Sequence, residues 1–282
     1  MKLTRRDMLK LGAGAVALSA TGIHPMAAPA NTAVKRIPIG LQLYSVRHAC
    51  AKDLPGVLKA VSEMGYEGVE YAGYYGRTAK ELHKLQDDNG LKCCGTHTGL
   101  NTLSDDAFDA TVEFNKTIGN KYLIVPGMSH EYTGSIEALK KTAKLYDKLA
   151  KKAKTVDMLV GYHAHGGDFR DMGGQTPWDL LFGNTCDDVV MQMDVGNCIG
   201  GGGDPYALLK KYPGRSKTIH LKEHGGDKKA VVGEGDVDWK QVFEICESTG
   251  GTEWYIVEHE RGVEGAMENV GRCLANLKKM GK

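Results

Sequence analysis

The chain has 282 residues, of which 41% are hydrophobic and 25% charged, and its 36 basic and 35 acidic residues leave a formal net charge of +1. This is the balance of an ordinary soluble globular protein. A nucleic-acid-binding protein would show a basic excess or a basic stripe, so the near-parity of charge argues against nucleic acid as a partner. The length allows two small domains or one large one, because α/β barrels reach about 200–250 residues as a single unit.

The first thirty residues differ in composition from the rest and predict an export signal at residues 1–30. The pair Arg5-Arg6 precedes an apolar run over residues 11–23, which is shorter than the roughly 20 residues that a membrane-spanning helix needs. Paired arginines before such a run are typical of a twin-arginine signal, here with cleavage near Ala30, and an ordinary secretion signal is the alternative. We therefore expect a periplasmic or otherwise exported protein that uses the twin-arginine export machinery and has no stable membrane anchor.

Short apolar runs then alternate with longer amphipathic stretches along the remainder of the chain. Eight runs predict strands: Pro38–Tyr44, Gly68–Tyr71, Leu91–Thr98, Tyr122–Val125, Met158–His165, Val189–Asp194, Ser216–Lys222 and Glu253–Glu258. Apolar residues at spacings of three and four predict helices between them, with the clearest at Leu54–Met64, Ser135–Lys154 and Trp239–Ser248. Eight strand and helix units in about 250 residues predict that residues 31–282 form one α/β domain, a (β/α)8 TIM barrel.

Glycine-rich segments give no support for nucleotide binding. No G-x-G-x-x-G pattern follows the first predicted strand, which argues against a dinucleotide site. The run Gly200–Gly203 is followed by Asp204-Pro205 and not by the Lys-Ser/Thr of a phosphate-binding loop. We expect this run to be a flexible loop over the site.

Polar residues close several of the predicted strands, where a barrel of this kind carries its catalytic groups. His163, Asp194, His220 and Glu258 come from four consecutive strands and can converge at the barrel mouth. Two imidazoles and two carboxylates suit manganese, cobalt, iron or zinc better than magnesium, so the sequence predicts one divalent metal ion there. The alternative is that each histidine is an ordinary buried or surface residue with its own hydrogen bonds.

The chain resembles the xylose isomerase-like TIM-barrel family, which includes sugar phosphate isomerase/epimerase-like enzymes and inosose dehydratase. The resemblance is carried in order by residues 40–45, 65–70, 162–169, 194–197, 220–222, 233–239 and 257–258. It implies metal ligands on strands five to eight, which map to His163, Asp194, His220 and Glu258. It also implies a sugar site lined by His165, Asp168, Asn197 and Lys222, with Glu70 and His97 facing it from earlier strands.

One position departs from the family pattern in a way that affects mechanism. In the ketose epimerases of this family the first ligand is a glutamate, which shares proton transfer with the glutamate of strand eight, whereas here position 163 is histidine. A metal-bound imidazole is a poor proton acceptor, although His165, Asp168 or Lys222 could supply a second base. The chemistry that remains open is enolisation, isomerisation, or elimination and hydration next to a ketone.

We therefore expect a metal-dependent enzyme of carbohydrate metabolism that acts on a small non-phosphorylated sugar or keto-sugar. The main hypothesis is a sugar isomerase or epimerase that works through a metal-stabilised enediolate, with Glu258, Lys222 and His165 as catalytic residues. The first alternative is a metal-dependent lyase or hydratase that acts on keto-glycosides, and the second is a non-catalytic exported carbohydrate-binding module. A homo-oligomer is left open.

Overall fold

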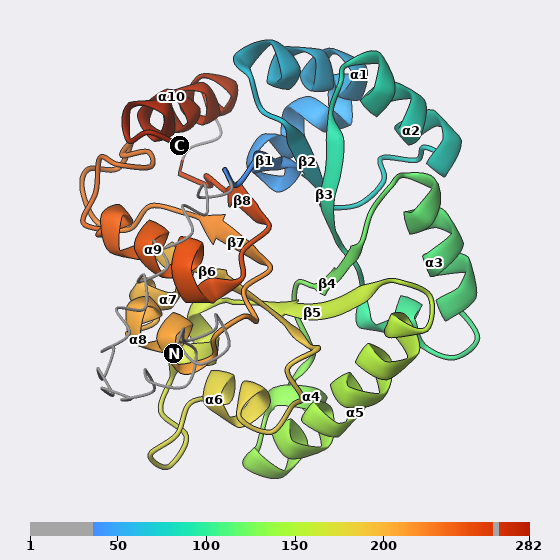
Figure 1. Ribbon diagram of the computed structural model, residues 1–282, viewed down its shortest axis with the longest axis vertical. Helices are drawn as coiled ribbons and strands as arrows, with labels where there is room; N and C mark the ends of the chain where they lie inside the picture. The colour runs from blue at the N-terminus through green and yellow to red at the C-terminus, as the bar shows by residue number, and fades with distance from the viewer. Residues whose placement is uncertain (1–35, 262–264) are drawn as a thin grey trace, which may run out of the picture. The chain divides into compact units, whose positions relative to one another are not determined.

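Eight strands form one closed parallel barrel in the order β1 to β8, which confirms the predicted (β/α)8 fold (Figure 1). The computed structural model describes residues 36–261 and 265–282, so the predicted export signal and the predicted domain start at residue 31 lie outside the described residues. The strands are β1 Ile39–Gln42, β2 Gly68–Tyr71, β3 Lys92–His97, β4 Tyr122–Val125, β5 Leu159–His163, β6 Val190–Asp194, β7 Thr218–Leu221 and β8 Trp254–Val257. Each strand lies within the apolar run that predicted it.

The strands are buried on both faces, which is why they read as apolar runs and not as alternating patterns. In β6, Met191 and Met193 belong to the hydrophobic core, whereas Gln192 and Asp194 alternate with them and are also fully buried. Successive side chains of a strand point to opposite faces, so the second pair points into the barrel. The interior of the barrel is therefore polar near the carboxyl end of this strand.

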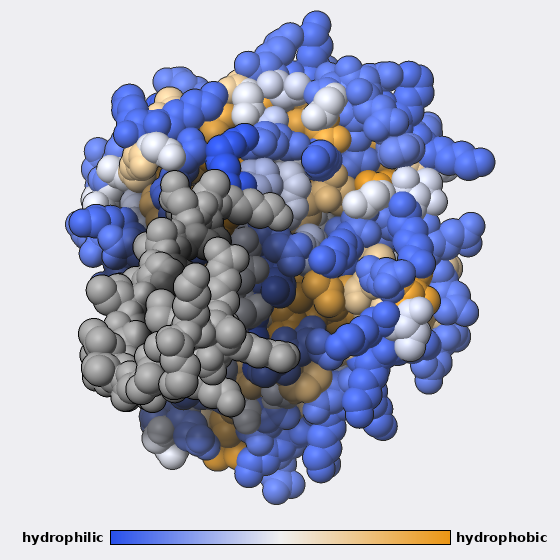
Figure 2. Space-filling model, viewed as in Figure 1, coloured by the Kyte–Doolittle hydropathy of each residue, from blue (hydrophilic) through white to orange (hydrophobic). Residues whose placement is uncertain are grey.

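Helices surround the barrel in the view of Figure 1. The helical elements between and after the strands are η1 Leu43–Val46, α1 Arg47–Met64, α2 Ala79–Asp88, η2 Leu100–Leu103, α3 Phe108–Thr117, α4 His130–Thr133, α5 Ile136–Lys154, η3 Gly166–Phe169, α6 Pro177–Phe182, α7 Val195–Gly200, α8 Pro205–Lys211, α9 Trp239–Ile245, η4 Cys246–Gly250 and α10 Ala266–Lys279. Figure 2 shows mostly hydrophilic residues on the visible described surface. Among residues 36–261 and 265–282, no helix is long and apolar enough to cross a membrane.

The three helices that the spacing predicted are present with somewhat different ends. The predicted helix Leu54–Met64 is the second segment of α1, which starts earlier and breaks at Asp53, where the backbone leaves helical geometry and the side chain accepts the Gly56 N–H at 3.0 Å. Gly65 takes the left-handed conformation (φ 100°) after the last turn, as expected of a C-cap. The helix predicted to reach Ser248 instead ends as an α-helix at Ile245 and continues as the π-turn η4.

The glycine run after β6, which was expected to be a flexible loop over the site, consists of the last residue of helix α7 and a tight turn. Gly200 ends helix α7, and the following backbone packs closely against the segment after β5. A Cβ atom on Gly201 would lie 2.2 Å from the Gly166 carbonyl oxygen, and one on Gly203 would lie 2.8 Å from Phe169 Cδ1. Glycine is used here for close approach between two segments.

Candidate metal centre

The four predicted ligands meet at the carboxyl ends of β5 to β8. His163 and Asp194 are the last residues of β5 and β6, His220 lies in β7, and Glu258 follows β8 directly. One ligand atom from each of the four side chains lies within 4.8 Å of the others, and all four residues are buried. The convergence that the strand pattern predicted is therefore present, with two imidazoles and two carboxylates.

The chemistry of this group fits a divalent cation. Asp194 Oδ1 accepts the Asn197 N–H at 2.7 Å, but Asp194 Oδ2 is buried without a hydrogen-bond partner among the described residues. An unpaired buried carboxylate oxygen is costly, and burial accordingly raises the pKa of Asp194 to about 7 against the influence of Lys222. A cation shared with His163, His220 and Glu258 would satisfy this oxygen, and mixed nitrogen and oxygen ligation suits transition metals.

His220 lies between two carboxylates. Its Nε2 is 2.6 Å from Glu70 Oε2, and its Nδ1 is 2.5 Å from Glu258 Oε2. Burial alone would lower the pKa of His220, but the two carboxylates outweigh burial and raise it to about 10. The ring orientation is thus fixed by Glu70 on the far side, which leaves Nδ1 facing the ligand set as in carboxylate–histidine–metal arrangements.

Gln192 completes this support and was missed by the sequence reasoning. Its Oε1 is 3.0 Å from His163 Nδ1 and 3.2 Å from His97 Nε2, and its Nε2 donates to Glu70 Oε1 and Thr218 Oγ1 at 2.8 and 2.9 Å. An amide oxygen can only accept, so His163 donates from Nδ1 and its Nε2 is left for the metal. The alternation of side chains along β6 could have indicated Gln192, because it lies two residues before Asp194 and so points to the same inward face.

Glu70 and His97 were predicted to face the substrate. Glu70 is instead fully buried and bonds His220, Gln192 and the side-chain amide of Gln42, the last at 2.6 Å. The structure therefore places Glu70 with the groups that hold the ligands. His97 is 11% exposed at its side chain, and its ring stacks on that of His220 with centroids 5.6 Å apart.

Lys222 lies at the rim of the centre. Its Nζ is 3.4 Å from Glu258 Oε1 and 3.8 Å from Asp194 Oδ2, and it also donates to Glu260. Burial lowers the pKa of Lys222, but the three carboxylates outweigh burial and raise it above its ordinary value. Lys222 is therefore a cation at neutral pH. Glu260 lies two residues after Glu258, and no role was predicted for it from the sequence.

The remaining predicted residues lie in the segments that follow β5 and β6, with His165 just before η3, Asp168 within η3 and Asn197 within α7. The His165 ring is 4.8 Å from that of His163, and burial lowers its pKa, so His165 is neutral at neutral pH. Asp168 accepts hydrogen bonds from the Tyr162 hydroxyl at 3.1 Å and the His165 backbone N–H at 2.8 Å. Asn197 donates to the Ala164 carbonyl at 3.0 Å. His165 is placed beside the centre, while substrate contacts of the other two stay predictions.

Comparison with known proteins gives relatives along most of the chain. A model of the xylose isomerase-like TIM barrel family matches residues 58–278. An inosose dehydratase from Clostridium tetani is 27% identical and one from Lacticaseibacillus casei 26% identical, each match covering 72% of this chain and 82% of the relative. A sugar phosphate isomerase/epimerase from Parabacteroides distasonis superposes with a TM-score of 0.74 at 26% identity, covering 86% of this chain and 98% of that one. The IOLI protein, solved with a zinc atom, has the same fold at 14% identity (TM-score 0.64, covering 86% of this chain and 98% of that one).

Proposed function

The chain belongs to the xylose isomerase-like TIM barrel family, and on this premise we propose that it is a metal-dependent lyase that removes water from a polyhydroxylated ketone. It is an enzyme, as its family and its inosose dehydratase relatives indicate. The observation that carries the lyase proposal is the histidine at position 163, beside which the centre offers one neutral imidazole and one ammonium group. These relatives support the lyase alternative better than the main isomerase hypothesis.

The metal ligands in this proposal are His163, Asp194, His220 and Glu258. When bound, a divalent cation would supply a Lewis acid for the substrate carbonyl. Nitrogen ligands favour zinc, manganese, cobalt or iron over magnesium, and the zinc atom in the IOLI protein supports that group of metals. Burial raises the pKa of Glu258, but the hydrogen bond from His220 and the charge of Lys222 outweigh it and hold the pKa well below its usual range, so Glu258 remains an anionic ligand.

His165 and Lys222 are suited to the two proton transfers of an elimination. The neutral His165 imidazole accepts the proton from the carbon next to the ketone, and the electron pair of that C–H bond becomes the new C=C bond. The C–O bond of the neighbouring hydroxyl breaks, and the Lys222 ammonium supplies the proton with which the hydroxyl leaves as water. Each group has the protonation state at neutral pH that its role requires.

An isomerase or epimerase is the second candidate, because the similarity to the Parabacteroides sugar phosphate isomerase/epimerase is specific in both sequence and fold. In that reaction a proton returns to the substrate and no water is lost. Glu258 and His165 would have to act as the two bases. The low pKa of Glu258 and its place in the ligand set make it a weak base for this purpose.

We propose a substrate without a phosphate group. Lys222 lies among the carboxylates of Asp194, Glu258 and Glu260, so its own charge is already balanced and is not free to hold a phosphate. The predicted export signal points the same way, because sugar phosphates belong chiefly to the cytoplasm. Export and a periplasmic location remain proposals.

The product distinguishes the two candidates. Metal-loaded protein would be incubated with inosose and with a panel of keto-sugars in deuterated water, and the products analysed by mass spectrometry and NMR. The lyase proposal expects an unsaturated or diketone product lighter by one water. A product that has lost no water and has gained deuterium next to the carbonyl would refute the lyase and support the isomerase.

A further inference from the structure

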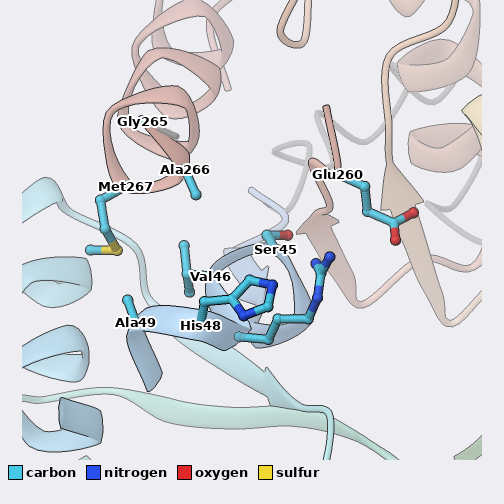
Figure 3. Close-up of a pocket in the computed structure, with 9 residues that line it drawn as sticks. Ser45, Val46, His48, Ala49, Glu260, Gly265, Ala266 and Met267 are labelled. Atoms are coloured by element: carbon cyan, nitrogen blue, oxygen red, sulfur yellow. The ribbon is translucent and has the colours of Figure 1, made fainter. Parts of the chain in front are cut away.

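A cavity lies between the segments that follow β1 and β8, at the end of the barrel where the metal centre lies. Its volume is about 230 Å³. The start of α1 (Arg47, His48, Ala49), the loop residue Glu260 and the start of α10 (Ala266, Met267) line it (Figure 3). All of these residues belong to segments at the carboxyl ends of the strands, where barrels of this kind bind their substrates.

Two contacts join this cavity to the centre. Glu260, in the cavity wall, accepts a hydrogen bond from Lys222, whose Nζ is 3.4 Å from the ligand oxygen Glu258 Oε1. The backbone N–H of His259 donates to Ser45 Oγ at 3.0 Å, which ties the segment after β8 to the segment after β1. The Lys222–Glu260 pair therefore belongs both to the rim of the centre and to the wall of the cavity.

The lining suits a neutral hydroxylated ring better than an anion. Within the described part of the chain, Arg47 uses one of its five N–H donors, in a hydrogen bond to the Tyr44 carbonyl at 2.8 Å. Glu260 is an acceptor for hydroxyl groups and repels a phosphate or carboxylate. Ala49, Ala266 and Met267 present apolar surface to the C–H face of a ring.

The size of the cavity limits its occupant to about one ring. Pockets that enclose a drug-sized molecule are roughly 300–1,000 Å³, and this cavity is smaller than that range. We propose that it is a subsite for a sugar ring joined to the ketone that reacts at the metal centre, so that the substrate is a keto-glycoside. This inference rests on the proposed lyase function and names the substrate class of the same site.

Filling the cavity tests the proposal. Ala49→Phe and Ala266→Phe each place a ring in the cavity, one from α1 and one from α10, and neither position is a metal ligand, Lys222 or His165. Ala51→Phe is the matched control, because Ala51 is an exposed residue of the same helix outside the cavity lining. The probes are a ketohexose and the same ketohexose carrying a glucosyl group, and folding is checked by circular dichroism.

We expect the unmodified enzyme to prefer the glucosylated ketone in kcat/KM by about tenfold or more, because the remote ring contributes binding energy. Either filling variant should lose this preference while its kcat/KM for the free ketohexose changes by less than about twofold, and Ala51→Phe should keep it. Equal kcat/KM for the two ketones in the unmodified enzyme would overturn the subsite, as would an equal loss on both ketones in the filling variants.

The subsite and the lyase function fail in different ways. Loss of water from the free ketohexose, without preference for the glycoside, leaves the lyase standing and refutes the subsite. If neither ketone loses water, the lyase proposal fails, and calorimetry with the glucosylated ketone decides the subsite. Weaker binding to both filling variants than to the unmodified protein supports the subsite, and unchanged binding overturns it.

Discussion

Replacing Gln192 with methionine should weaken metal binding although Gln192 is not a ligand. Methionine has a similar length and no amide, so the substitution removes four buried hydrogen bonds to His163, His97, Glu70 and Thr218. Without the acceptor at Nδ1, the His163 ring is no longer held with Nε2 toward the metal. Loss of such supporting contacts costs about 10–100-fold in metal affinity, which is about 1.4–2.8 kcal/mol.

Stability should fall as well, because polar groups are left without partners. A buried group that loses its partner costs about 1–3 kcal/mol, and the imidazole N–H groups of His163 and His97 both lose one. We therefore expect the free energy of unfolding of the metal-free protein to drop by about 2–4 kcal/mol in Gln192→Met. Urea unfolding measures this change.

Gln86→Met is the matched control. Gln86 is also a buried glutamine, and its amide, in the orientation that satisfies both ends, bonds the backbone of Ile118 and Cys93 far from the ligands. Gln86→Met should lower stability and leave metal affinity unchanged. Metal affinity would be measured for each variant by competition with a chelator of known Kd. The same metal affinity in Gln192→Met and Gln86→Met would refute the reasoning about the His163 tautomer.

Three further outcomes follow from the charges at the centre. Because Glu70 and Glu258 raise the pKa of His220 to about 10, metal binding near pH 8 should release about one proton, and the pKa of about 7 for Asp194 adds release from a second group below pH 7. Metal affinity should thus fall about tenfold per pH unit between pH 9 and pH 7, and more steeply below pH 7. Calorimetry in buffers of different ionisation enthalpy measures the protons released. A metal affinity that does not change with pH would contradict this prediction. Lys222→Met should lower the elimination rate by about 10²–10⁴-fold, because the proposed acid is lost. Metal binding should be kept or tightened, because the substitution removes a cation 3.8 Å from Asp194 Oδ2. An unchanged elimination rate excludes Lys222 as the acid. His165→Gln should lower the rate by a similar factor and remove the rise of rate with pH on the acidic side; a variant that keeps that rise shows that another group is the base.

The sequence predicts the ligand set because polar residues interrupt or end runs that are otherwise apolar. His163, Asp194, His220 and Glu258 stand out for this reason, and the parallel barrel then brings the ends of their strands together. Because successive side chains of a strand point to opposite faces, the sequence also predicts that His163 points into the barrel and Tyr162 points out. In the structure the Tyr162 ring lies near Trp178 among the helices.

The supporting glutamines were not predicted, since their role depends on contacts between distant strands. Gln192 and Gln42 lie inside the runs that predict β6 and β1, where a single amide gives no pattern of its own. The family resemblance implied that Glu70 faces the substrate, but its contacts with His220, Gln192 and Gln42 depend on how the neighbouring strands are staggered. Composition alone predicts a mobile loop for the glycine run after β6, whereas the close approach of Gly201 to Gly166 depends on a contact between distant segments.

Metal titration of the dehydration reaction tests the central claim most directly. Protein stripped with a chelator would be reloaded stepwise with zinc or manganese, and water loss from inosose measured at each step. We predict no dehydration by the metal-free protein, a rise in rate that is proportional to bound metal and ends at one ion per chain, and no metal-dependent rise in His220→Ala. Dehydration that proceeds equally well without metal, or conversion of inosose only to an isomer of the same mass, would contradict the account.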